Sequence, residues 1–88
     1  MPKRKKIGLI VRTRDEQIDA IQISCIQKLN TVEELVFVDA DDLFNNESKI
    51  RDILMSLIED NEIYTTLPKR LIDPIGLYHG FIHLVYYL

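Results

Sequence analysis

Basic side chains gather at the start of the chain, where their type and spacing suit contacts with phosphate groups. The first fourteen residues contain no acidic residue and six basic ones: Lys3, Arg4, Lys5, Lys6, Arg12 and Arg14. The remainder holds five basic and fourteen acidic side chains, and the whole chain has a net charge of -3. A basic arm of this kind binds phosphates or simply solubilises a strand end. The acidic remainder argues against a broad nucleic-acid-binding surface.

Two further sets of side chains have spacings that could bind a metal ion. Asp39, Asp41 and Asp42 directly follow an apolar run, a place where α/β sheets bind ligands, and carboxylate oxygens suit Mg²⁺. His79 and His83 are four residues apart, so on a helix they would share one face. Two histidines do not complete a site, and a solvated turn accounts for the aspartates. We therefore expect buried or interfacial histidines, and neither a metal nor another cofactor.

Two apolar patterns alternate along the chain and predict its elements. Nearly continuous apolar runs at 7–11 and 35–38 predict two strands. The segment 63–67, rich in β-branched and aromatic residues, predicts a third. A helical period from Asp15 to about residue 29 predicts a first helix. A second helix is predicted by the stripe Ile50, Ile53, Leu54, Leu57 and Ile58.

The last eighteen residues form the most apolar part of the chain. Asp73 followed by Pro74 predicts the start of a third helix that runs toward Leu88. Charged and polar residues interrupt this stretch, which falls short of the roughly 20 apolar residues that span a membrane. It has too many apolar groups for one core-facing stripe, so part of it would meet a partner protein or a second copy. The predicted interface comprises Ile75, Gly76, Gly80, Phe81, Val85 and Tyr86; a helix covered by its own sheet is the alternative.

This alternation predicts an α/β fold, a small three-layer sandwich in which a parallel three-stranded sheet has helices on both faces. With 88 residues, 47% of them hydrophobic, the chain suits one globular domain, 1–88, with a basic arm at 1–6. Its single cysteine, Cys25, cannot form an internal disulfide, which favours intracellular residence. We expect no signal peptide, and a cytoplasmic protein.

Two motifs give the chain a resemblance to a known family. The first is Ile7-Gly8-Leu9-Ile10-Val11-Arg12-Thr13-Arg14-Asp15-Glu16-Gln17. It resembles the opening motif of serine recombinases of the resolvase/invertase family, Ile-Gly-Tyr-Ala-Arg-Val-Ser-Thr-Asp-x-Gln. The second is Leu67-Pro68-Lys69-Arg70-Leu71-Ile72-Asp73, in the place of the family's Leu-Asp-Arg-Leu-x-Arg. The resemblance implies a resolvase-like fold with strand order 2-1-3, truncated relative to the family's catalytic domain.

The resemblance also implies which positions would belong to an active site. The family's nucleophilic serine falls on Thr13 and its first active-site arginine on Val11. Arg70 keeps an arginine of the second motif, Arg51 falls on the arginine of an Arg-Pro-x-Leu segment, and Asp73 replaces another arginine. Serine recombinases attack a DNA phosphodiester, and several cations must stabilise the developing charge. Thr13, Arg51 and Arg70 are therefore vestigial catalytic positions.

These replacements favour an inactive, truncated relative of the catalytic domain. It would act by protein association, as a regulator in a mobile-element or prophage system. Two alternatives stay open. One is a small DNA-associating protein that uses the basic arm with Arg12, Arg14 and Arg70. The other is an enzyme with residual strand transfer through Thr13 or metal-dependent chemistry at residues 39–42.

Overall fold

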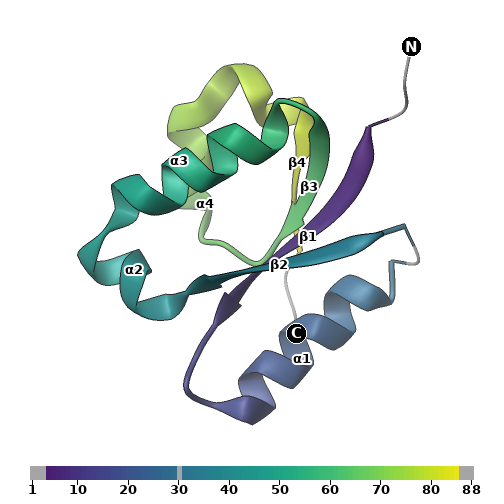
Figure 1. Cartoon of the computed structure of the whole chain (residues 1–88), viewed down its shortest axis with the longest axis vertical. Helices are drawn as coiled ribbons and strands as arrows, with labels where there is room; N and C mark the ends of the chain where they lie inside the picture. The colour runs from purple at the N-terminus through teal and green to yellow at the C-terminus, as the bar shows by residue number, and fades with distance from the viewer. Residues whose placement is uncertain (1–3, 30, 86–88) are drawn as a thin grey trace.

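Four parallel strands form one sheet in the computed structural model, which describes residues 4–29 and 31–85, without the side chains of residues 76–79 (Figure 1). Their order across the sheet is β2-β1-β3-β4. Along the chain the elements are β1 (Lys5–Arg12), α1 (Glu16–Gln27), β2 (Glu34–Asp39), α2 (Ala40–Asn45), α3 (Glu47–Ile58), β3 (Asn61–Thr65), α4 (Lys69–Ile72), the 3-10 helix η1 (Asp73–Phe81) and β4 (Ile82–Leu84).

The central strand is β1, which pairs with β2 on one side and with β3 on the other. Ile7 lies opposite Glu34 of β2 and opposite Ile63 of β3. The apolar run from Ile7 to Val11 is buried, as a strand covered on both faces requires. The α/β fold with a parallel sheet is confirmed, and its first three strands have the expected order 2-1-3.

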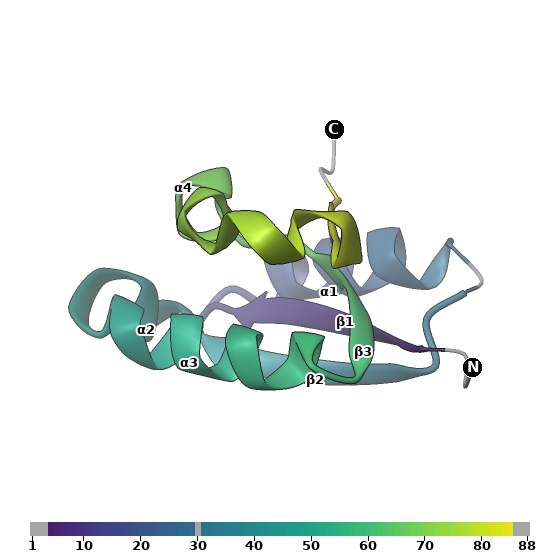
Figure 2. The same ribbon diagram turned by 90° about the horizontal axis from the view of Figure 1, so that it is seen from above.

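Helices cover the two faces of the sheet unequally. Figure 1 shows α1 and α3 on opposite sides of the sheet, and Figure 2 shows the α4–η1 segment beside α3. Three buried residues of α3, namely Ile50, Leu54 and Ile58, belong to the main core. The face under α1 is less well filled, because α1 buries Gln22 and Ile26 and leaves much of its apolar surface exposed.

Gly8 lets α1 approach the sheet closely. A Cβ atom at this position would lie 2.6 Å from Cγ2 of Ile26 and 2.9 Å from Cδ2 of Leu35. Both distances are shorter than van der Waals contact, so a larger side chain would push α1 away from β1. The glycine therefore fixes the position of α1 and of the loop that leads into it.

The prediction of a third helix from Asp73 to Leu88 is wrong. The α-helix begins at Lys69 and lasts four residues, and Pro74 lies inside the following 3-10 helix. Ile82 then pairs with Ile63 in a fourth strand. Part of the apolar stretch therefore belongs to a strand, in which Ile82 is buried, and needs no helical stripe. Leu88 lies outside the described residues.

The acidic segment after β2 also differs from the predicted turn. Asp39 ends the strand, and its Oδ1 accepts a hydrogen bond of 2.8 Å from the backbone N–H of Asp41. This cap starts the short helix α2 directly after the strand. Two further aspartates lie in the first turn of α2, where the helix dipole favours negative charge. Helix initiation thus explains the cluster of aspartates.

Candidate functional site

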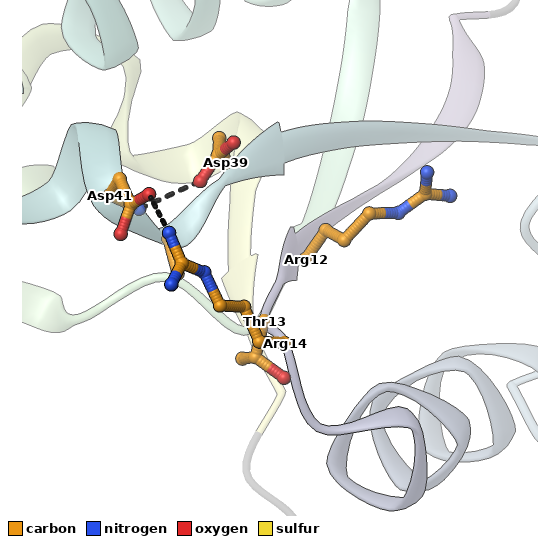
Figure 3. Close-up of a pocket in the computed structure, with 6 residues that line it drawn as sticks. Arg12, Thr13, Arg14, Asp39 and Asp41 are labelled. Atoms are coloured by element: carbon orange, nitrogen blue, oxygen red, sulfur yellow. Dashed lines mark hydrogen bonds and ion pairs between the residues drawn. The ribbon is translucent and has the colours of Figure 1, made fainter.

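A polar hollow of about 410 Å³ lies at the carboxyl edge of the sheet, between the ends of β1 and β2. Arg12 and Asp39 are direct neighbours across the two strands, so the residues that follow them meet at this edge. Parallel sheets bind ligands at this edge. The hollow, drawn in Figure 3, is lined by Arg12, Thr13, Arg14, Asp39, Ala40 and Asp41. It contains one of the three predicted catalytic positions and two of the predicted phosphate-binding arginines.

The hydroxyl of Thr13 takes part in the turn that starts α1. It lies 2.8 Å from Oδ1 of Asp19, to which it donates, and accepts a hydrogen bond of 3.0 Å from the N–H of Asp15. The backbone N–H of Thr13 donates to the same carboxylate oxygen at 2.8 Å. Asp15 in turn caps α1 by accepting from the N–H groups of Gln17 and Ile18. Thr13 therefore has a complete structural role in this turn.

Arg12 and Arg14 lie at the same edge but point in different directions, as Figure 3 shows. Arg14 extends toward Asp41, with 3.4 Å between Nη2 and Oδ2, and its side chain is 94% exposed. Arg12 extends away from the aspartates and places its guanidinium 4.3 Å from the ring centroid of Phe37. A weak surface ion pair and a cation–π contact leave the hydrogen-bonding capacity of both groups largely open.

Arg51 and Arg70 come together around Glu47 and do not line the hollow beside Thr13. Nη2 of Arg51 lies 3.0 Å from one carboxylate oxygen of Glu47, and Arg70 forms an ion pair with the other. The hydrogen bond from Arg70 is the main cause that lowers the pKa of the Glu47 carboxyl, with a further contribution from Arg51. The predicted catalytic set is thus divided between two places.

Much of the predicted basic arm contacts its own domain. Arg4 donates from Nη1 to the carbonyl oxygens of Ile58 at 2.7 Å and Asn61 at 3.0 Å, and it lies over the ring of Phe81. Lys5 pairs with a glutamate of β2, Glu34, whose hydrogen bond raises the lysine pKa. Lys6 donates its backbone N–H to the carboxylate of Glu33. Lys3 lies outside the described residues.

Four of the predicted interface residues, Ile75, Gly76, Gly80 and Phe81, lie in η1, and Val85 directly follows β4. Ile75 is half-buried against the core, and the N–H of Val85 donates to the carbonyl oxygen of Thr65 at 2.7 Å. Phe81 is partly exposed beneath Arg4. Gly76 and Gly80 lie in η1, and a Cβ at Gly80 would meet open space. Tyr86 lies outside the described residues.

Gln22 is a positioning residue that the sequence pattern did not reveal. Its buried side chain donates from Nε2 to the carbonyl oxygen of Val11 at 2.8 Å and accepts a hydrogen bond of 2.6 Å from the Thr66 hydroxyl. It thereby joins α1 to the carboxyl ends of β1 and β3. Its place four residues before the apolar Ile26 was the available signal, because this spacing puts both side chains on one face of the helix.

The possible metal ligands have other partners in the described part of the chain. His83 stacks on Tyr64, with 4.5 Å between ring centroids, and its Nε2 lies 2.5 Å from Oε1 of Glu62. Asp42 pairs with Lys49. The side chain of His79 lies outside the described set. Among the side chains that the structure describes, no three from His, Cys, Asp or Glu gather in a way that could hold a metal ion. The helices described there are all too short or too polar to cross a membrane.

The chain matches no family model, no curated protein and no solved structure in the three comparisons. The resemblance to serine recombinases therefore rests on the two motifs and their neighbouring segments alone. The geometry of the described side chains is the basis for the functional conclusion.

Proposed function

We propose that this chain is a non-catalytic domain that acts by protein association. The observation that carries the proposal is the exposure of large apolar side chains, above all Phe44 on α2, whose exposed fraction is 81%. Ile21 and Ile18 on α1 are also exposed, at 47% and 38%. A well-exposed aromatic ring is the type of side chain that fills a partner's pocket and dominates binding energy.

The hydrogen bonds around the vestigial catalytic positions support the absence of catalysis. Attack on a phosphodiester needs several cations directed at the phosphoryl group. Arg51 and Arg70 instead share the carboxylate of Glu47, and the hydroxyl of Thr13 is engaged by Asp19. The cations and the hydroxyl do not converge on a common point.

The resemblance to the resolvase/invertase family supports a regulatory role in a mobile-element or prophage system. The proposed partner is a second copy of this chain or a related catalytic domain. Ile75, Phe81 and Val85 remain candidates for part of that contact. Phe44 and Ile21 are the stronger candidates, because their exposed fractions of 81% and 47% exceed the 36% of Phe81.

Analytical ultracentrifugation over a concentration series tests the association. We expect the wild type to form dimers or larger species and Phe44→Ser to shift the equilibrium toward monomer. Met55→Ser is the matched control, since Met55 is a partly exposed apolar residue on the neighbouring helix α3. A wild type that stays monomeric at its highest soluble concentration, or equal effects of both substitutions, would contradict self-association through Phe44.

Incubation with supercoiled plasmid tests the catalytic half of the proposal. We expect no nicking by the purified chain. Nicking that disappears in Thr13→Val would show that Thr13 retains strand-transfer chemistry, and the domain would then be an enzyme.

A further inference from the structure

A groove of about 470 Å³ lies beside the polar hollow, and its lining includes the aromatic ring of Phe37. The groove is lined by residues of α1 and β2. The segment from Arg12 to Arg14 lines both the groove and the polar hollow. The groove's other lining residues are Glu16, Asp19, Ala20, Ile23 and Phe37. The volume is within the range of small-ligand sites, and the groove opens at the carboxyl edge of the sheet.

Arg12 lies over the ring of Phe37 in this groove. The guanidinium carbon lies 4.3 Å from the ring centroid, so the ring covers one side of the guanidinium and leaves the rest of the group accessible. Both residues are exposed. An arginine placed in this way is preorganised for a second stacking partner, because the planar guanidinium stacks on aromatic rings and on nucleobases.

The chain contains a second arginine–phenylalanine stack with a different use. Arg4 lies 3.7 Å from the ring centroid of Phe81, but its Nη1 donates to two backbone carbonyl oxygens at the end of α3 and the start of β3. That guanidinium joins the two elements. Arg12 has no hydrogen bond to a side chain or carbonyl oxygen among the described residues, which distinguishes a binding platform from a structural contact.

From these contacts we propose that the groove binds a nucleotide, with its base stacked on the accessible face of Arg12. Arg14 also lines the groove and supplies the charge for the phosphate by turning away from Asp41, because that pairing, at 3.4 Å, is weak and exposed. The exposed carboxylate of Glu16, in the same lining, accepts hydrogen bonds from the polar edge of the base. Guanine is the preferred base, because it has adjacent N–H donors on that polar edge. This ligand class goes beyond protein association.

Isothermal titration with GMP, guanosine and ribose 5-phosphate separates the base from the phosphate. We expect GMP to bind more tightly than either fragment, because the stacking surface and Arg14 then act together. AMP should bind more weakly than GMP, and the difference should shrink in Glu16→Gln. Equal binding of GMP and ribose 5-phosphate, or no saturable binding of GMP, would overturn the proposal.

Two substitutions test the stack itself. Arg12→Lys keeps the positive charge and removes the planar group, and Phe37→Ala removes the support. Each should weaken GMP binding about tenfold, within the range seen for base–aromatic stacking. Phe81→Ala is the matched control and should leave GMP affinity unchanged, with circular dichroism checking that each variant is folded. An Arg12→Lys variant that binds GMP as tightly as the wild type would show that charge alone is responsible and would refute base stacking.

The same chemistry could come from a free nucleotide or from an unpaired base in single-stranded nucleic acid. Titration with a short single-stranded oligonucleotide that contains one guanine distinguishes these sources. Tighter binding of the oligonucleotide than of GMP would support a single-stranded nucleic acid. Tighter binding of GMP would support a free nucleotide. Weakening of both ligands by Arg12→Lys is required in either case.

Discussion

Two pairs of arginines on the same domain have opposite surroundings. Arg51 and Arg70 share one carboxylate, that of Glu47. Arg12 rests on an aromatic ring, and Arg14 reaches its aspartate only at 3.4 Å with a nearly fully exposed side chain. In the first pair one carboxylate neutralises one of the two positive charges and binds both guanidinium groups, whereas the second pair retains most of its capacity for an external ligand. The count of arginines thus says little about ligand binding until their neighbours are known.

The two pairs of arginines also lie on or beside helices that bury different numbers of apolar residues. Glu47 and Arg51 belong to α3, which buries three apolar residues in the main core. The loop from Arg12 to Asp15 leads into α1, which has Gln22 and Ile26 as its buried residues. We therefore expect the Glu47 cluster to depend on core packing, and the carboxyl-edge site to depend on one close approach between α1 and the sheet.

The largest expected effect comes from the core under the Glu47 cluster. Leu54→Ala removes a fully buried side chain from α3 and should lower the free energy of unfolding by about 2–5 kcal/mol. Urea denaturation measures the change. Met55→Ala, at the next and partly exposed position, is the control and should cost far less. Equal losses of unfolding free energy in the two variants would show that the face of α3 that carries Leu54 is not the face that packs against the core.

The next effect concerns the support of the carboxyl-edge site. Gly8→Ala places a Cβ at 2.6 Å from Ile26 and should lower the free energy of unfolding by about 1–3 kcal/mol through overpacking. It should also weaken ligand binding at the edge, because α1 is displaced. Gly80→Ala, which meets open space, is the control. If both alanines have the same effect on urea denaturation, the close approach of α1 is not a constraint.

A smaller effect is expected in the pH dependence of stability. Because Arg70 and Arg51 lower the pKa of Glu47 in the folded state, the unfolded chain takes up the proton first. The stabilisation from this pairing is therefore fully present above the ordinary pKa of glutamate and is lost as the pH falls through the lowered value. Acid titration of urea stability should show a shallower decline in Glu47→Gln than in the wild type. Identical profiles would contradict the pairing.

The smallest effects are expected in DNA binding, when the carboxylate beside each pair of arginines is replaced by an uncharged amide. Glu47→Gln releases two arginines, so binding to duplex DNA at low salt should strengthen, and its log–log salt slope should steepen by about 1.8 if both then contact phosphates. Asp41→Asn should change the slope little, because Arg14 is already accessible. Titrations at several salt concentrations measure both. A larger change in Asp41→Asn would reverse the proposed difference between the two pairs.

The sequence could predict the elements whose pattern is strong and local. The apolar run from Ile7, the start of α1 just after Asp15 and the stripe of α3 all lie where the periodicity indicated. The C-terminal strand could not be predicted, because Ile82 is a strand residue only through its pairing with Ile63, 19 positions earlier. The aspartates after β2 gave a turn signal, although Asp39 caps a helix.

The candidate site was predictable to the extent that it follows the strands. Thr13 directly follows β1 and Asp39 ends β2, so a parallel sheet brings both to the same edge. The contact of Arg12 with Phe37 and the sharing of Glu47 by two arginines could not be predicted. Both depend on distances between different elements, which the spacing of residues along the chain does not contain.

The central position of β1 has a consequence for synthesis on the ribosome. Its pairing partners follow it in the chain, and β3 ends at Thr65, 54 residues after Val11. At typical elongation rates that interval lasts about 3–10 s. During it the apolar run from Ile7 to Val11 has no complete sheet to enter. The nascent chain should therefore be a substrate for ribosome-associated chaperones until the third strand emerges.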